Sequence, residues 1–284
     1  MLKNQSLISK HARSFNWAGF FLPKETFKKC SILYDFCRTI DDIVDVDSDL
    51  EIKQKKFAEF KSSFKNKNSS NSVIKNICEL IEQENIPKKI VEDLFDGVES
   101  DLKLQVVLGN KKELLVYSYR VAGTVGLMMA KIFKVKDVFA LKGAIDLGIA
   151  MQLTNISRDV LEDKKINRYY IKHDFESIKE TIEIADTFYK SSFVALKSIP
   201  IISRFSIIVS RRIYKKIGRK ILKQKNLENY NNAGKIYVSV FDKIVETFLG
   251  LYDLLRLFFV SSKEHLKQNE YKMLNKEINL DERI

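Results

Sequence analysis

The sequence predicts an all-α protein, and two features of its composition support that prediction. Hydrophobic residues make up 45% of the 284-residue chain, and only ten glycines and three prolines interrupt it. So few helix breakers favour long helices over a sheet with many tight turns. No alternating strand pattern and no repeated strand–helix–strand unit stands out. No linker divides the chain, so we expect one domain over 1–284, with the motifs in a core over 6–260 and a polar tail over 261–284.

The elements are expected in order from the spacing of apolar residues. Residues 24–45 should form a helix, because apolar side chains from Phe27 to Ile40 recur at roughly helical spacing. Residues 61–71 are rich in Lys, Ser and Asn and should form a loop, and a break is expected near Pro87. Further helices are predicted over 88–107, 113–133, 137–163, 177–196, 201–225 and 236–257.

Two glycines lie inside the apolar segment 113–133. Gly123 and Gly126 each cost a helix roughly 1 kcal/mol relative to alanine. Tight packing against a neighbouring helix would explain them, and so would a kinked helix beside a long apolar tunnel. The sequence leaves both interpretations open.

An acidic pair ends the first long helix. Asp41 and Asp45 are four residues apart, so they point from one face of the helix. At about 100° per residue, Tyr34 and Arg38 fall on the same arc, which is about 60° wide. A solvated face with ion pairs between residues four apart explains this stripe as well as a ligand site does.

A second acidic pair, Asp159 and Asp163, ends the helix predicted over 137–163. Gln152 and Asn155 fall on the same arc, and the preceding residues 144–151 are almost wholly apolar. Such a helix is buried on most sides, and a buried amide without a partner costs on the order of 1–3 kcal/mol. A cluster of metal ions and diphosphate would supply those partners, so we favour a ligand site here.

If the two helices face each other, the carboxylate oxygens of the two acidic pairs form a concave cluster. Hard divalent cations such as Mg²⁺ prefer oxygen ligands and commonly bring phosphates with them. Cationic residues flank the second pair, and others cluster over 211–220. They suit a diphosphate held by metal ions and by direct Arg and Lys contacts, although a solvated basic face explains most of them individually.

The net charge of +12 admits nucleic acid, an anionic membrane surface or a polyanionic substrate as partner. No zinc-finger, RNA-binding or basic-zipper pattern is present, so nucleic acid is not expected.

Three cysteines without a CxxC pair fit a reducing, cytoplasmic setting. Residues 1–10 lack the apolar core of a signal peptide. The apolar run 248–260 is too short to span a bilayer, so membrane contact would be peripheral, at the inner face.

These motifs resemble the squalene/phytoene synthase family, the head-to-head prenyl transferases. Five blocks carry the resemblance, over residues 11–15, 34–45, 96–102, 117–126 and 152–163. A sixth and weaker one, over 214–218, looks like the Tyr-x-x-Ile-Gly block of bacterial phytoene synthases. Residues 230–235 depart from the family, which often has Trp-Asp-x-Arg there. Gln105 and Val106 depart too, where the family often has Arg-Tyr.

The resemblance implies an isoprenoid-synthase-type helical bundle around a central active-site cavity. It implies that the metal ions, Mg²⁺ or Mn²⁺, are bound through the diphosphates by Asp41, Asp45, Asn155, Asp159 and Asp163. Arg38, Asn155 and Arg158 would assist at the diphosphate or metal. Residues implied at the reacting centre or the substrate are Tyr34, Tyr117, Gln152 and Tyr214, with His11, Ser14 and Phe15 from the N-terminal block.

The expected activity is that of a phytoene synthase, which joins two geranylgeranyl diphosphates through a cyclopropyl diphosphate. The alternatives within the family are squalene, dehydrosqualene or hydroxysqualene synthesis from farnesyl diphosphate. A non-catalytic relative acting as an assembly or binding protein is the alternative from another class. Such a relative should have eroded metal motifs, and both acidic motifs are intact here.

Overall fold

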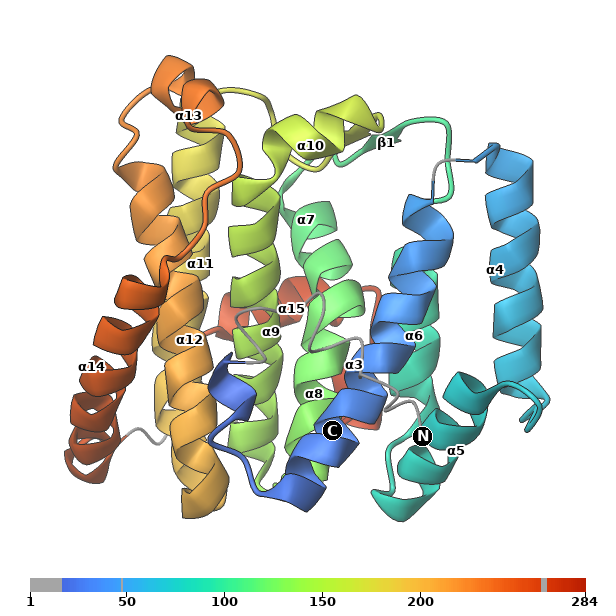
Figure 1. Ribbon diagram of the computed structural model, residues 1–284, viewed down its shortest axis with the longest axis horizontal. Coiled ribbons are helices and arrows are strands. Elements are labelled where there is room, and N and C mark those ends of the chain that lie inside the picture. The colour runs from blue at the N-terminus through green and yellow to red at the C-terminus, as the bar shows by residue number, and fades with distance from the viewer. Residues whose placement is uncertain (1–16, 47, 262–264) are drawn as a thin grey trace.

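Long helices stand side by side around a central helix, α9, in the computed structural model, which describes residues 17–46, 48–261 and 265–284 (Figure 1). The all-α prediction is confirmed. The helices are α3 (Lys24–Asp45), α4 (Leu50–Lys65), α5 (Ser72–Gln83), α6 (Lys88–Glu99), α7 (Lys111–Ser118), α8 (Thr124–Ile132), α9 (Val138–Arg158), α10 (Val160–Lys165), α11 (Phe175–Ala195), α12 (Ile201–Leu222), α13 (Leu227–Ala233), α14 (Val240–Phe259) and α15 (Gln268–Leu274). α9 packs against α8, α11 and α12.

Several predicted boundaries need correction. α4 continues to Lys65, into the segment expected to be a loop, because Phe57 and Phe60 anchor the helix in the core. The helix expected over 88–107 ends at Glu99, and Val106–Val107 form a short strand, β1, instead. The last large helix begins at Val240, four residues later than expected.

The segment 113–133 is a helix in three parts. α7 leads into a π-helical turn, Tyr119–Gly123, which continues into α8. A Cβ atom on Gly126 would collide with the carbonyl oxygen of Ala144 in α9, and one on Gly148 would collide with that of Ala122. These glycines therefore allow a close approach of two helices. Ala122 and Gly126 also line a cavity, so Gly126 serves the tight packing of the two helices and at the same time borders an apolar cavity.

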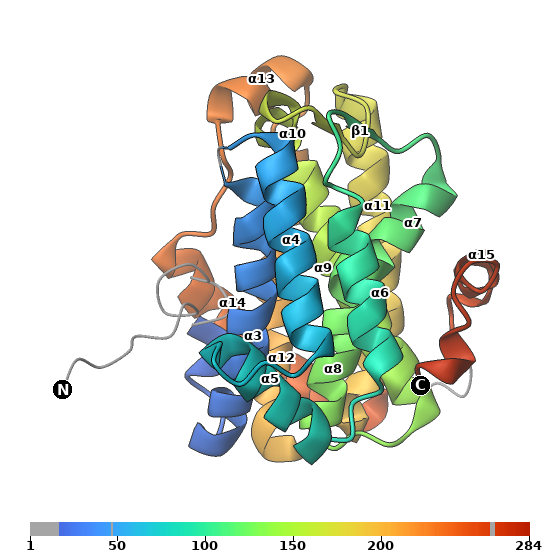
Figure 2. The same cartoon turned by 90° about the vertical axis from the view of Figure 1, so that its right-hand side faces the viewer.

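One hydrophobic cluster extends from Cys30 in α3 to Leu280 near the C-terminus. Residues 261–284 are more than a polar tail, because Tyr271, Leu274 and Ile278 are buried in this cluster. The side chain of Arg283 binds both carboxylate oxygens of Asp93, at 2.9 and 3.0 Å. α15 lies at the edge of the bundle beside α7 (Figure 2). Contacts with distant parts of the chain hold this segment against the helical bundle. The polar composition of the segment does not reveal them.

A short parallel strand pair joins two loops at one end of the bundle. β1 pairs with β2 (Arg168–Tyr169), with Val106 opposite Arg168 and Val107 opposite Tyr169. The pair fixes the loop after α6 beside the segment that follows α10. It therefore brings the residues around Asp101 close to Arg168.

Within the described part of the chain, no helix combines the length and the apolar composition needed to cross a membrane.

Candidate active site

A cavity of about 1050 Å³ lies between α3, α8, α9, α12 and the segment before α14. This volume slightly exceeds the range of about 300–1,000 Å³ that is usual for ligand pockets. Its lining on α9 extends from Ala140 to Arg158, which corresponds to roughly 27 Å along the helix axis. The cavity is therefore long enough to accept an extended apolar chain.

The cavity is apolar along most of its length and polar at one end. On α9 the lining is almost wholly apolar from Ala140 to Met151 and becomes polar at Gln152. The C-terminal ends of α3 and α9 lie at the same end of the bundle (Figure 1). The polar lining residues are Tyr34, Arg38, Asp41, Gln152, Asn155, Arg158, Tyr214, Lys235 and Tyr237, together with Ser210, Ser239 and Lys243.

The first acidic pair lies at this polar end. Asp41 is accessible from the cavity but surrounded by protein atoms, and its pKa is raised to about 7 by loss of solvation and by the nearby charge of Asp45. Arg168 Nη1 donates to Asp45 Oδ1 at 2.9 Å. Arg38 lines the cavity, pairs with Asp42 at 2.5 Å, and has a buried Nε without a partner among the described residues. At Asp41, repulsion from Asp45 outweighs the attraction of Arg38.

The second acidic pair does not lie on one continuous helix, which corrects the prediction of a helix over 137–163. α9 ends at Arg158, and Asp159 leads into α10, which carries Asp163. Arg158 Nε donates to Asp159 Oδ1 at 2.8 Å, and Lys235 Nζ lies 3.0 Å from the same oxygen. Burial and then the charge of Asp159 raise the pKa of Asp163 to about 7.

Asp101 connects the two pairs. Tyr117 Oη donates to its Oδ2 at 2.8 Å, and Tyr170 Oη donates to its Oδ1 at 2.9 Å. The charge of Asp101 raises the pKa values of both Asp41 and Asp163, while burial raises its own pKa. Since the interaction of two charges weakens with distance, Asp101 lies near one carboxylate of each pair.

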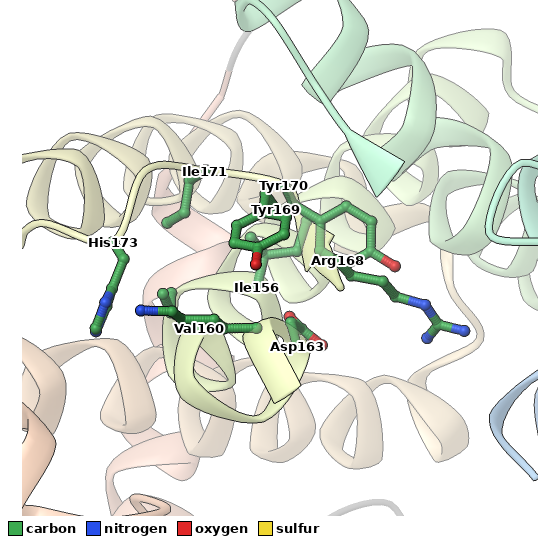
Figure 3. A pocket seen from close by; sticks show the side chains of 9 residues that line it. Ile156, Val160, Asp163, Arg168, Tyr169, Tyr170, Ile171 and His173 are labelled. Carbon is green, nitrogen blue, oxygen red and sulfur yellow. The ribbon is translucent and has the colours of Figure 1, made fainter. Parts of the chain in front are cut away.

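A small pocket lies behind the second pair, lined by Asp163, Arg168, Tyr169, Tyr170 and His173 among others (Figure 3). In this view Asp163 and Arg168 lie near one another, and His173 lies at the other end. The volume of about 10 Å³ suits roughly one water molecule and not a diphosphate. We therefore place substrate in the large cavity.

Asn155 provides a test of whether a metal fits. Its Oδ1 is buried without a hydrogen-bond partner in the described part of the chain, while Tyr214 bonds to the same side chain. No group of three or more His, Cys, Asp or Glu residues within 17–46, 48–261 and 265–284 is placed to hold a metal ion unaided. An unpaired amide oxygen in a cavity that Asp41 also lines suits Mg²⁺, provided that a ligand such as diphosphate supplies further oxygens.

The predicted site residues fall into three groups. Seven line the cavity: Tyr34, Arg38, Asp41, Gln152, Asn155, Arg158 and Tyr214. Four lie next to it and not in its lining: Asp45, Asp159, Asp163 and Tyr117. Tyr117 is stacked on Tyr170, with 4.6 Å between ring centres, and reaches the site through Asp101. His11, Ser14 and Phe15 lie outside the described residues.

Sequence reasoning missed Asp101, Arg168, Tyr170 and Lys235 as site residues. Asp101 belongs to one of the motif blocks, and Arg168 belongs to the basic flank, so a signal existed for both. Lys235 lies in the segment that departs from the family pattern, and its contact with Asp159 spans 76 residues (159 to 235). No local pattern reports such a contact.

Most of the basic cluster over 211–220 serves another purpose. Arg212 Nε lies 2.9 Å from Glu246 Oε2, and Lys220 Nζ lies 2.9 Å from Asp242 Oδ2. These cations bind α14 and do not line the cavity. These side chains therefore belong neither to a diphosphate site nor to a solvated face.

A helical bundle with a long apolar cavity, closed at one end by carboxylates and cations, defines a class of protein that binds an apolar chain with an anionic head. The sequence model of the squalene/phytoene synthase family matches residues 8–175. The chain belongs to the squalene/phytoene synthase family, whose members act on prenyl diphosphates and generally depend on divalent metal ions.

Among curated relatives, the chain is 28% identical over 251 residues to 15-cis-phytoene synthase from Paracoccus sp., covering 78% of this chain and 82% of that one. It is 27% identical over 247 residues to a phytoene synthase from Pseudescherichia vulneris, covering 75% and 80%. A solved dehydrosqualene synthase has the same fold, with a TM-score of 0.68, 23% identity and coverage of 88% and 95%. A squalene synthase from Alicyclobacillus acidocaldarius gives a TM-score of 0.66 at 16% identity, covering 77% and 91%.

Proposed function

We propose that this protein is a phytoene synthase that joins two geranylgeranyl diphosphates head to head. The reaction passes through a cyclopropyl diphosphate, and each of its two stages releases one diphosphate and one proton. The similarity to proteins named phytoene synthase over most of both chains carries the choice of substrate. The long apolar cavity with its charged end supports the reaction class.

We infer that Mg²⁺ or Mn²⁺ would be held by Asp41, Asp45, Asn155, Asp159 and Asp163, together with diphosphate oxygens. When bound, such ions act as Lewis acids that neutralise the charge of a leaving diphosphate. The raised pKa values of Asp41 and Asp163, one carboxylate of each pair, and the unpaired Asn155 oxygen support this assignment.

Three cations of the chain bind the diphosphates. Arg38, Arg158 and Lys235 line the polar end of the cavity. Arg presents planar donors that suit phosphate oxygens, and Lys adds a compact charge. Because Arg158 and Lys235 already contact Asp159, they can shift between this carboxylate and the substrate as its charge develops.

The walls protect the reacting carbons. Apolar side chains such as Val125, Met129 and Leu147 exclude water from the cationic intermediates. Tyr34 and Tyr214 line the polar end, where their ring faces can stabilise a carbocation. Gln152 lies on the same wall and orients the substrate head.

We infer that the protein works in the cytoplasm and meets a membrane only peripherally. Its cysteines Cys30, Cys37 and Cys78 are free, which fits a reducing compartment. The product has no polar group and must pass into lipid.

Incubation with labelled geranylgeranyl diphosphate and with labelled farnesyl diphosphate, each with Mg²⁺, tests the proposal. We expect phytoene from the C20 substrate and a kcat/KM at least tenfold lower for the C15 substrate. Conversion of farnesyl diphosphate alone would assign squalene-type synthesis instead. Conversion of neither, by a folded protein that still binds diphosphate, would favour the non-catalytic relative.

A further inference from the structure

Helix α14 has its charged side chains inside and its apolar side chains outside. Lys243, Glu246 and Asp253 are buried, which reverses the usual arrangement of a surface helix. Within this helix, which is described throughout, Arg256 is the one charged residue among the exposed positions. The other exposed residues form what we call the apolar face: Val240, Phe241, Ile244, Phe248, Leu249, Leu251, Tyr252, Leu255, Phe258 and Phe259.

Ion pairs with α12 fix this orientation. Arg212 lies 2.9 Å from Glu246 Oε2 and 2.6 Å from Asp253 Oδ2, and Lys216 lies 3.1 Å from Asp242 Oδ1. Rotation of α14 to hide its apolar face would leave these largely buried charges without partners, which is strongly unfavourable. The apolar face is therefore held outward by the fold.

The apolar surface extends beyond α14. α12 runs antiparallel to it, and Ile201 and Ile202 at the start of α12 are exposed. In Figure 1, α14 forms one edge of the molecule, opposite α4. A contiguous exposed apolar patch of this kind marks an interaction site.

The apolar face is continuous with the wall of the cavity. Tyr237 and Val240 line the cavity and are also 60% and 63% exposed. A molecule leaving the cavity beside these residues would meet the apolar face directly. An apolar product that moves along apolar surface avoids the free-energy cost of exposing its chain to water.

Charge also favours a lipid surface. The chain carries a net charge of +12. Arg219, in the last turn of α12, and Lys223, directly after it, are exposed near the start of α14, since Lys220 beside them binds Asp242. Basic residues around an apolar helix face attract it to anionic lipid.

We propose that the apolar face of α14 docks into the interfacial region of an anionic lipid bilayer. The helix lies along the surface, with its charged side bound to α12, and passes the apolar product from the cavity into lipid. The choice of lipid as occupant rests on the proposed function, because that function gives a product without a polar group.

Sedimentation of the full chain with vesicles of equal parts phosphatidylglycerol and phosphatidylcholine tests this proposal. The variant Phe248→Glu/Phe258→Glu changes two side chains that are 68% and 61% exposed and do not line the cavity. The matched control Ile52→Glu/Val138→Glu changes two exposed apolar residues away from α14. We expect at least about a tenfold loss of vesicle binding for the α14 variant and wild-type binding for the control.

Turnover in detergent micelles shows whether each variant retains its fold, and we expect wild-type rates for both. Vesicle binding that is equal in wild type and the α14 variant would overturn the proposal, as would failure of the wild type to bind. A wild-type dimer that the α14 variant converts to monomer, without vesicle binding, would assign the face to a second copy. Vesicle binding without phytoene formation would reject the proposed function and leave the docking surface intact.

Discussion

Side chains from distant parts of the chain share the charge balance at the polar end of the cavity. The helical arcs of α3 and α9 identified Tyr34, Arg38, Gln152 and Asn155, because each arc depends only on local spacing. Asp101, in the turn after α6, could not be placed from local spacing, since its partner Tyr170 lies 69 residues further along the chain. Local periodicity thus identifies residues on one face, and only the fold shows which faces meet.

At the scale of single residues, we predict the effect of replacing Lys235. Lys235→Met removes a cation that pairs with Asp159 at 3.0 Å and lines the cavity. Hydrogen bonds to charged groups contribute about 1.5–3 kcal/mol, so KM for the prenyl diphosphate should rise about tenfold or more. The ion pair is partly exposed, so the free energy of unfolding should change by less than about 1 kcal/mol.

Steady-state kinetics and thermal unfolding measure both effects. Lys223→Met, at an exposed position directly after α12, is the matched control and should leave KM unchanged. An equal rise of KM in both variants would show that general charge, and not the contact with Asp159, matters.

Among the elements, the sequence predicted the bounds of α3 correctly, because its apolar residues recur regularly and Pro23 precedes its first turn. It predicted one helix over 137–163, whereas the chain turns at Asp159. Arg158 and Lys235 bind Asp159 there, and the partner Lys235 is distant in sequence. Local helix propensity therefore could not predict the break between α9 and α10.

The contact between α8 and α9 gives a prediction at the scale of elements. Gly148→Ala should destabilise the protein by about 1–3 kcal/mol or more, because its Cβ would collide with the backbone of Ala122, which cannot yield easily. Gly109→Ala is the control, since a Cβ there meets only the Glu113 carboxylate at an ordinary distance. Thermal unfolding of both variants decides: equal melting temperatures would contradict the close approach of these helices.

For the whole molecule, the acidic site links stability to pH and to metal. The folded-state pKa values of Asp41 and Asp163 are raised to about 7, from unfolded values near 4. The folded protein thus holds more protons than the unfolded chain between about pH 4 and 7. These two groups therefore lower the stability of the metal-free protein as pH rises through that window.

Mg²⁺ with inorganic diphosphate should reverse this loss, because bound cations favour the ionised carboxylates. The rise in melting temperature on adding both ligands should be larger at pH 8 than at pH 5.5, and Asp41→Asn should reduce the difference. A ligand-induced rise that is the same at both pH values would contradict the assignment of these carboxylates.

The central claim is that the two acidic pairs and the cavity form one metal-dependent site that ionises prenyl diphosphates. Single-turnover release of diphosphate from labelled geranylgeranyl diphosphate tests it most directly, in the wild type, in Asp163→Asn and in the neighbouring control Glu162→Gln. Loss of a group that holds charge at the reacting centre lowers rates by about 10²–10³-fold. We expect that loss in Asp163→Asn, a near-normal rate in Glu162→Gln, and no release without divalent cations. Undiminished release by Asp163→Asn, or release by the wild type in excess chelator, would contradict the account.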